Sequence, residues 1–299
     1  MRSTMINEQQ SERFENGSGF IAALDQSGGS TPKALAQYGV DESAYSSEEE
    51  MFALIHQART RIITSPVFNE KRIIGAILFE NTLDRQIEGK PSAVYLWENK
   101  NIVPILKIDR GLAEKSDGVQ LMKDIPGLDA LLARAKEQGV YGTKERSVIH
   151  EANPASIKAV VDQQFELAKR VLDAGLVPIV EPEVTVGIPD KLEAEELLKA
   201  ELLKHLGGLD GKKVALKLTI PTAENFYQDL IAHPAVARVV ALSGGYSREE
   251  ANRLLARNNG LIASFSRALL EGLSAGQSEE EFNHTLDATI EDIYQASLT

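Results

Sequence analysis

A lysine stands in the middle of an apolar stretch, KVALKLTIP, at residues 213–221. In a strand, alternation places Lys217 on one face and the apolar side chains on the other: Val214, Leu216, Leu218 and Ile220. Burial disfavours an ammonium ion, so a buried lysine can supply a neutral, nucleophilic amine. The stretch therefore predicts a nucleophile at Lys217. The alternative is a strand-end lysine whose stem packs while its head reaches water.

Other strand-like runs also end in charged residues: Asp25, Glu80, Lys107, Lys144 with Arg146, and Glu181 with Glu183. If apolar side chains face outward, alternation sends the charged side chains inward together. Neighbouring strands lie about 4.8 Å apart. The predicted result is a row around one mouth: Lys107, Lys144, Glu181 and Lys217. The alternatives are a network of ion pairs alone and, for Asp25, a helix cap.

Two stretches rich in glycine and serine are typical of anion sites. LSGGYSREE (242–250) opens a helix after the seventh run, and DQSGGSTPK (25–33) follows the first run. Small residues let backbone N–H groups approach an anion, and a helix N-terminus adds favourable partial charge. Arg267, just past the eighth run, supplies a guanidinium. Two such stretches predict a substrate with a phosphate at each end, although DQSGGSTPK could also be a flexible turn.

Eight apolar runs alternate with helical patterns. The runs cover residues 20–25, 73–80, 103–109, 140–146, 176–184, 213–220, 236–244 and 261–266. Helices are expected at 47–65, 125–139, 153–175, 192–208 and 247–260, with a loop or hairpin at 111–126. This order predicts an α/β fold, a (β/α)₈ TIM barrel, as a single domain over residues 1–299. We expect its core at about 20–270 and a terminal helix at about 278–297. The alternative, an open doubly wound sheet, lacks a G-x-G-x-x-G after its first strand.

Composition narrows the functional classes. The chain of 299 residues is 43% hydrophobic and 25% charged, and its net charge of −12 argues against nucleic-acid binding. It has no cysteine, and its five histidines show no ligand spacing, so we expect neither thiolate chemistry nor a metal site. No apolar run approaches the roughly 20 residues of a membrane span, and the polar start MRSTMINEQQSERF has no signal-peptide core. The cytoplasm is the expected location. A second methionine at position 5 leaves the natural start open.

Seven motifs run in order from about residue 20 to residue 270: FIAALDQSGGS, LKIDRG, GTKER, LVPIVEPEV, LKLTIP, LSGGYSREEA and ASFSRAL. With these motifs the chain resembles a class I fructose-bisphosphate aldolase of the shorter bacterial branch. VPIVEPE upstream of the lysine strand is the specific motif, whereas the short glycine motifs are not. The resemblance implies a metal-independent lyase of glycolysis and gluconeogenesis that cleaves fructose 1,6-bisphosphate through a lysine Schiff base, with no cofactor.

The resemblance also implies residue roles. Lys217 matches the Schiff-base lysine and Glu181 the general acid and base, with Glu183 beside it. Lys144 matches the lysine that assists this centre, and Asp25 the aspartate that orients the lysine and the substrate hydroxyl. For one phosphate it implies Lys107, Arg146, Ser27 and Ser30. For the other phosphate it implies Ser243, Gly244, Gly245, Ser264 and Arg267.

The sequence departs from the animal pattern at two places. Gln26 follows Asp25 where those enzymes carry an acid, and the chain stops at Thr299 without their longer tail and its terminal tyrosine. Tyr294, in the expected last helix, is a poor substitute, so the group that protonates the enamine is left open.

The rival interpretations are another Schiff-base barrel aldolase, such as a transaldolase-like enzyme, and a non-catalytic sugar-phosphate sensor. The expected partners are small sugar phosphates, with neither nucleic acid nor membrane. A homo-oligomer is compatible with the sequence, which does not fix the oligomeric state.

Overall fold

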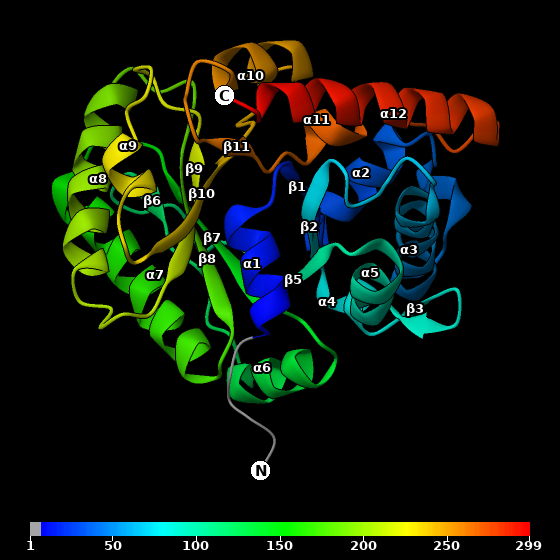
Figure 1. The fold of residues 1–299 in the computed structure, drawn as a ribbon, viewed down its shortest axis with the longest axis horizontal. Coiled ribbons are helices and arrows are strands. Elements are labelled where there is room, and N and C mark those ends of the chain that lie inside the picture. The colour runs from blue at the N-terminus through cyan, green and yellow to red at the C-terminus, as the bar shows by residue number, and fades with distance from the viewer. Residues whose placement is uncertain (1–6) are drawn as a thin grey trace.

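The computed structural model describes residues 7–299, and these form a single α/β barrel (Figure 1). Its eight parallel strands follow the order of the chain: β1 (Phe20–Leu24), β2 (Ile73–Leu78), β5 (Val103–Lys107), β7 (Gly142–Ile149), β8 (Val177–Val184), β9 (Val214–Thr219), β10 (Val236–Leu242) and β11 (Ile262–Ala263). The Ala23 amide in β1 donates a hydrogen bond of 3.2 Å to the Phe265 carbonyl just past β11. The first and last strands therefore meet, and the predicted barrel is confirmed.

Helices connect these strands around the outside. They are α2 (Thr31–Gln37), α3 (Glu48–Thr64), α4 (Glu80–Leu83), α5 (Ser92–Lys100), α6 (Leu128–Glu137), α7 (Pro154–Asp173), α8 (Lys191–Leu206), α9 (Gln228–Ile231), α10 (Arg248–Leu255) and α11 (Arg267–Leu270). The expected terminal helix is α12 (Glu279–Ala296), which starts with a capping box between Ser278 and Glu281 and lies beside α10 and α11 (Figure 1). Among residues 7–299, no helix is both long and apolar enough to cross a bilayer.

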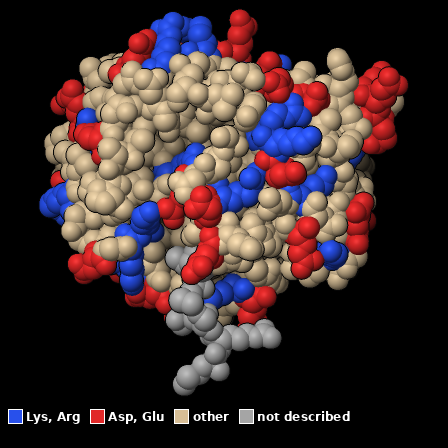
Figure 2. Space-filling view, in the orientation of Figure 1, with Lys and Arg blue, Asp and Glu red and all other residues tan. Residues whose placement is uncertain are grey.

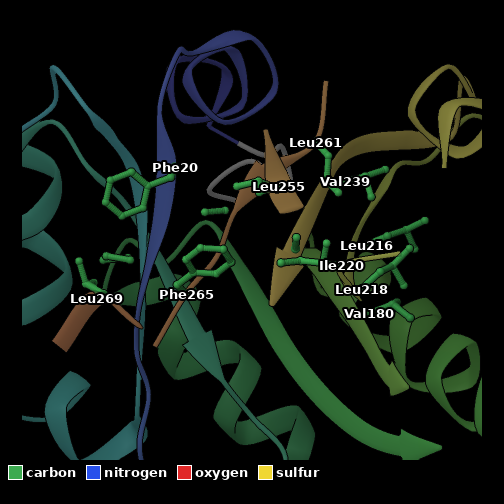
Figure 3. Packing of buried hydrophobic residues seen from close by; sticks show 14 of the residues in the cluster. Phe20, Val180, Leu216, Leu218, Ile220, Val239, Leu255, Leu261, Phe265 and Leu269 are labelled. Carbon is green, nitrogen blue, oxygen red and sulfur yellow. The ribbon is translucent and has the colours of Figure 1, made fainter. Parts of the chain in front are cut away.

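Alternation along the strands separates two apolar layers. The outward side chains pack against the helices, and Figure 3 shows Leu216, Leu218 and Ile220 of the β9 region pointing together into that layer near Val180. The inward residues of the lower barrel form a separate cluster, which includes Ile105, Ile179 and Ala215 among others. The predicted parity of these strands is therefore confirmed. Because the lower interior is filled with apolar side chains, the polar side chains on the same face are left at the strands' carboxyl ends.

A short helix that the sequence analysis did not predict closes the bottom of the barrel. Helix α1 (Glu8–Asn16) begins at Asn7, whose side chain accepts hydrogen bonds from two backbone amides of the first turn. Its Phe14 is fully buried within the interior cluster, with its ring centroid 5.2 Å from that of Tyr141. The helix lies in front of the barrel in Figure 1. It leaves the opposite end, where the strands finish, as the open mouth.

Two short strand pairings lie outside the eight-strand path of the barrel. At the mouth, β6 (Val119–Gln120) pairs antiparallel with the end of β7, and Leu112 bridges Met122. The stretch 111–126 is therefore a hairpin over the mouth, as expected. Strands β3 (Gln86–Ile87) and β4 (Lys90–Pro91) form a separate ribbon. On the face of the molecule in Figure 2, acidic and basic side chains are interspersed and do not form one basic field, in keeping with the net charge of −12.

Candidate active site

A cavity of about 350 Å³ opens at the carboxyl ends of the strands, within the usual size range of small-molecule sites. It is lined by every residue that the sequence analysis proposed for the site except Gly245. These lining residues are Asp25, Ser27, Ser30, Lys107, Lys144, Arg146, Glu181, Glu183, Lys217, Ser243, Gly244, Ser264 and Arg267. The fold therefore brings together side chains from strands far apart in the sequence.

Four buried ionisable groups form the centre of the cavity. The Lys144 ammonium lies 2.6 Å from Asp25 Oδ2 and 2.9 Å from Glu181 Oε2. The Lys217 nitrogen lies 3.2 Å from Glu181 Oε1. All four residues are at most 8% exposed. One carboxylate, Glu181, is therefore shared by two lysines, and Lys144 is shared by two carboxylates.

The charges of this cluster hold one another in place. Burial alone raises the pKa of Asp25, but the nearby Lys144 and Lys217 outweigh it and hold that pKa well below its usual range. Burial alone lowers the pKa of Lys144, but the Asp25 and Glu181 carboxylates outweigh it and raise that pKa well above its usual value. At neutral pH, Asp25 is a carboxylate and Lys144 an ammonium ion. Neither is placed to gain or lose a proton easily.

Glu181 retains hydrogen-bonding capacity. Its Oε2 contacts Lys144 as an ion pair but accepts no hydrogen bond from any residue in the described part of the chain. Its other oxygen reaches Lys217. A buried carboxylate with an unused lone pair beside an amine is suited to move a proton between that amine and a bound molecule.

Two further ion pairs line the way into this centre. Lys107 Nζ lies 2.6 Å from Asp109 Oδ1, and Arg146 Nε donates to Glu183 Oε2 over 2.6 Å. Asp109 also accepts from the Arg146 backbone amide at 3.2 Å, so it contacts the ammonium of Lys107 and the backbone of Arg146. Of the four residues in the predicted row, ion pairs therefore link only Lys144, Glu181 and Lys217. Lys107 shares the cavity with Lys144, Glu181 and Lys217, but its own ion-pair partner is Asp109.

The stretch after β10 has the features of an anion cradle. Gly244 and Gly245 have φ values of 62° and 103°, which favour glycine, and a Cβ on Gly244 would come within 2.5 Å of Val186. Ser264 is 1% exposed, and its hydroxyl has no hydrogen-bond partner among residues 7–299. The exposed Arg267 lies against Gly245. A buried unpaired hydroxyl beside small residues and a guanidinium is a suitable environment for a phosphate.

The stretch after β1 is organised differently. The Ser30 hydroxyl donates to the Ser27 carbonyl at 2.8 Å and accepts from the Ser27 amide at 2.9 Å. This closes a tight turn over exposed Gly28 and Gly29 before α2. Both serines line the cavity, although the Ser30 hydroxyl is already used within the turn.

One of the charged residues expected to face inward lies elsewhere. Glu80, at the predicted end of the second run, is the first residue of α4 and forms ion pairs with Arg110 and Arg134. It is not among the residues that line the cavity. Strand alternation no longer applies to Glu80, because the chain has already turned into a helix.

Four lining residues were not predicted as site residues: Gln26, Lys33, Leu242 and Ser266. Gln26 directly follows Asp25, and its side-chain amide donates to Ser266 Oγ at 2.5 Å, linking the ends of β1 and β11. Lys33 lies within the quoted stretch DQSGGSTPK, so its position beside a phosphate-like turn was a usable signal. In the described part of the chain, no three side chains from His, Asp or Glu are grouped in a way that could hold a metal ion.

The fold and the lysine–carboxylate centre define a barrel enzyme suited to chemistry on a carbonyl carbon. Residues 7–220 match the family model described as fructose-bisphosphate aldolase class-I. The chain is 60% identical over 294 residues to the fructose-bisphosphate aldolase class 1 of Synechocystis sp., with 98% of each chain covered. It is 61% identical to the enzyme of that name from Clostridium acetobutylicum, with 98% of this chain and all of that chain covered. The chain therefore belongs to the class I fructose-bisphosphate aldolase family.

Other similarities extend this result. A fructose-bisphosphate aldolase class 1 from Porphyromonas gingivalis is 57% identical over 293 residues, covering 98% of this chain and all of that one. A solved structure of fructose-bisphosphate aldolase from Plasmodium falciparum, in complex with TRAP and a small-molecule inhibitor, superposes with a TM-score of 0.76 at 23% identity. It covers 99% of this chain and 98% of that chain. At this level of identity, the superposition supports the barrel fold.

Proposed function

We propose that this protein catalyses the reversible aldol cleavage of fructose 1,6-bisphosphate to dihydroxyacetone phosphate and glyceraldehyde 3-phosphate. The observation that carries the proposal is the Lys217 nitrogen, buried 3.2 Å from Glu181 beside a fixed Lys144 ammonium. The membership of this chain in the class I fructose-bisphosphate aldolase family supports this choice of substrate. We further propose that the reaction needs no metal and serves glycolysis and gluconeogenesis in the cytoplasm.

The first half of the proposed reaction makes an iminium ion. The neutral Lys217 amine attacks the C2 carbonyl carbon of the open-chain ketose, and a proton passes from its nitrogen to the carbonyl oxygen to give a carbinolamine. Glu181 protonates that hydroxyl, water leaves, and a C=N bond to Lys217 forms. The Lys144 ammonium, held by Asp25 and Glu181, provides a fixed positive charge next to the Lys217–Glu181 pair.

The second half breaks the carbon–carbon bond. Glu181 removes the proton of the C4 hydroxyl, the C3–C4 electron pair moves into the iminium, and glyceraldehyde 3-phosphate leaves. The resulting enamine is protonated at C3. Water then adds to the iminium, the C–N bond breaks, and dihydroxyacetone phosphate is released with Lys217 restored. Asp25, ionised and fixed by Lys144, orients the substrate hydroxyls.

The proposal assigns one phosphate to each side of the mouth. Arg267 and the Ser264 hydroxyl, with the backbone of the glycine turn after β10, bind the phosphate next to the ketone. Lys107, Arg146 and the serine turn after β1 bind the second phosphate. Because Lys107 and Arg146 are paired with Asp109 and Glu183, the second phosphate has to share or replace those carboxylates.

The test is a steady-state assay of purified protein with three ketose phosphates in excess chelator. We expect cleavage of fructose 1,6-bisphosphate at an undiminished rate with EDTA, and a higher kcat/KM for it than for fructose 1-phosphate. Fructose 6-phosphate, which lacks the phosphate next to the ketone, should be the poorest of the three. Binding of the bisphosphate without cleavage, or a preference for fructose 6-phosphate, would contradict the proposal.

A further inference from the structure

Thr219 lies two residues beyond Lys217 on the inward face of β9, and it has no assigned role. The regular pairing of β9 with β8 stops before the active-site residues, since its last matched residues are Val180 and Leu216. Beyond that point, the strands that carry Glu181 and Lys217 run on without a matched register. Something else must set their separation where the two catalytic side chains meet.

The Thr219 hydroxyl joins the two strands beyond the end of this pairing. It donates to the Val184 carbonyl at 2.7 Å and accepts from the Val184 amide at 2.9 Å. Thr219 is 1% exposed, so water does not compete for these bonds. Its neighbours Leu218 and Ile220 point the other way, into the helix layer (Figure 3). The Thr219 side chain thus makes the hydrogen bonds between strands that backbone groups make elsewhere in the barrel.

Thr219 also lies under the glycine turn of the candidate phosphate site. A Cβ placed on Gly244 would lie 3.7 Å from the Thr219 methyl group. The backbone carbonyl of Thr219 accepts a hydrogen bond of 3.4 Å from the Tyr227 hydroxyl. The Thr219 methyl group and the Thr219 hydroxyl therefore make different contacts. The methyl group lies towards the phosphate turn, and the two hydrogen bonds of the hydroxyl go to Val184 of β8.

We propose that Thr219 is a positioning residue for the aldol reaction: its hydroxyl fixes the spacing of β8 and β9 and so keeps Glu181 within reach of Lys217. The inference rests on the proposed function. The Lys217–Glu181 contact of 3.2 Å is already at the long end of the distances that support proton transfer. Misplacing reacting groups by 1 Å can cost about 100-fold in rate. Loss of the hydroxyl should therefore affect the chemical steps more than substrate binding.

The experiment compares Thr219→Val with Thr219→Ser. Valine keeps the shape and the methyl group but replaces the hydroxyl by a second methyl group, whereas serine keeps the hydroxyl. We expect Thr219→Val to lower kcat for fructose 1,6-bisphosphate by at least about tenfold while KM changes by less than about threefold. Trapping of Lys217 by dihydroxyacetone phosphate and borohydride should slow in parallel. Thr219→Ser should keep kcat within about twofold of the unmodified protein.

Thr143→Val is the matched control. Thr143 is another fully buried strand threonine, but its hydroxyl donates to Glu145, on the outer face of β7. We expect it to lower the thermal midpoint as Thr219→Val does, while kcat stays unchanged. If Thr219→Val does not fold, Thr219→Ala, which also lacks the hydroxyl, takes its place in the comparison.

The outcomes separate this inference from the proposed function. A kcat for Thr219→Val within twofold of the unmodified protein, or equal kcat losses in Thr219→Val and Thr219→Ser, would overturn the positioning role alone. Equal losses in Thr219→Val and Thr143→Val would do the same. An unmodified protein that cleaves no fructose 1,6-bisphosphate and takes no label at Lys217 would overturn the proposed function and, with it, this inference.

Discussion

The two faces of β7 carry neighbouring ionisable residues in opposite electrostatic settings. Lys144 faces the barrel interior, where Asp25 and Glu181 lie 2.6 and 2.9 Å from its ammonium. Glu145 faces the helix layer, is fully buried and forms no ion pair within residues 7–299. Its Oε2 accepts from the Thr143 hydroxyl at 3.2 Å, and its Oε1 has no hydrogen-bond partner among residues 7–299.

The comparison shows what keeps a buried group charged. Burial raises the pKa of Glu145 well above its ordinary value, so the outer face of β7 holds a neutral acid. Around it, Gln164 Nε2 donates to the Glu145 carbonyl at 3.3 Å and to Ser147 Oγ at 3.0 Å, again without charge. On the inner face, converging carboxylates outweigh the same burial and keep Lys144 an ammonium. One strand is thus ionic where it faces the cavity and neutral where it packs against the helices.

The largest expected effect comes from removing the inner cation. Lys144→Met leaves the buried Asp25 carboxylate without its ion-pair partner and leaves Glu181 paired with Lys217 alone. We expect kcat to fall by about 10²–10⁴-fold and the thermal midpoint to drop, because an uncompensated buried charge is destabilising. Steady-state kinetics below the midpoint and a thermal melt check both. A kcat within about threefold of the unmodified protein would show that the inner face does not need its fixed cation.

An intermediate effect is expected at the rim, where a cation is exposed. Arg267 lies against Gly245 and lines the cavity without belonging to the central cluster. Arg267→Ala should raise KM for fructose 1,6-bisphosphate by about 10–100-fold, as expected for loss of a charge-assisted contact, with little change in kcat. Arg257→Ala, a change at an exposed arginine whose partner is Glu224, is the control. An unchanged KM in Arg267→Ala would remove Arg267 from the phosphate site.

The smallest effect on activity is expected on the outer face of β7. Glu145→Gln replaces a neutral acid by a neutral amide of the same shape, so kcat should stay within about twofold. The folded protein holds the Glu145 proton above the pH at which the unfolded chain loses it. The unmodified protein therefore loses stability as pH rises above about 4.3, by up to about 1.4 kcal/mol per pH unit, until the raised pKa is reached.

The glutamine variant lacks this penalty. The difference in thermal midpoint between Glu145→Gln and the unmodified protein should therefore grow in favour of the variant from pH 5 to pH 8. Melts at matched ionic strength measure it. A difference that does not change with pH would mean that Glu145 ionises as easily in the folded as in the unfolded chain.

Much of the fold is predictable because its signal is local. Apolar strand-like runs predicted all eight barrel strands, and alternation within three of them placed Lys107, Glu181 and Lys217 on the inward face. Helix α1 gave no such signal, because only Gln10 and Phe14 are buried in it. Glu80 was misplaced because strand alternation was carried one step too far, into the first turn of α4.

The pairing within the site depends on tertiary geometry. In register, Arg146 lies opposite Glu181 and Lys144 opposite Ile179, yet the Lys144 ammonium reaches Glu181 and Arg146 reaches Glu183. Alternation gives the face of a side chain but not how far it leans along a tilted strand. The role inferred for Thr219 was hidden for the same reason, since it depends on where β8 and β9 stop pairing.

The central claim is that Lys217, and not the neighbouring Lys144 or Lys107, forms the covalent bond to substrate. Reduction with borohydride in the presence of dihydroxyacetone phosphate, followed by digestion and mass spectrometry of the peptides, tests it directly. The account predicts one stoichiometric label on Lys217, absent from Lys217→Arg, which should also be nearly inactive. A label on Lys144 or Lys107, or full turnover by Lys217→Arg, would contradict it.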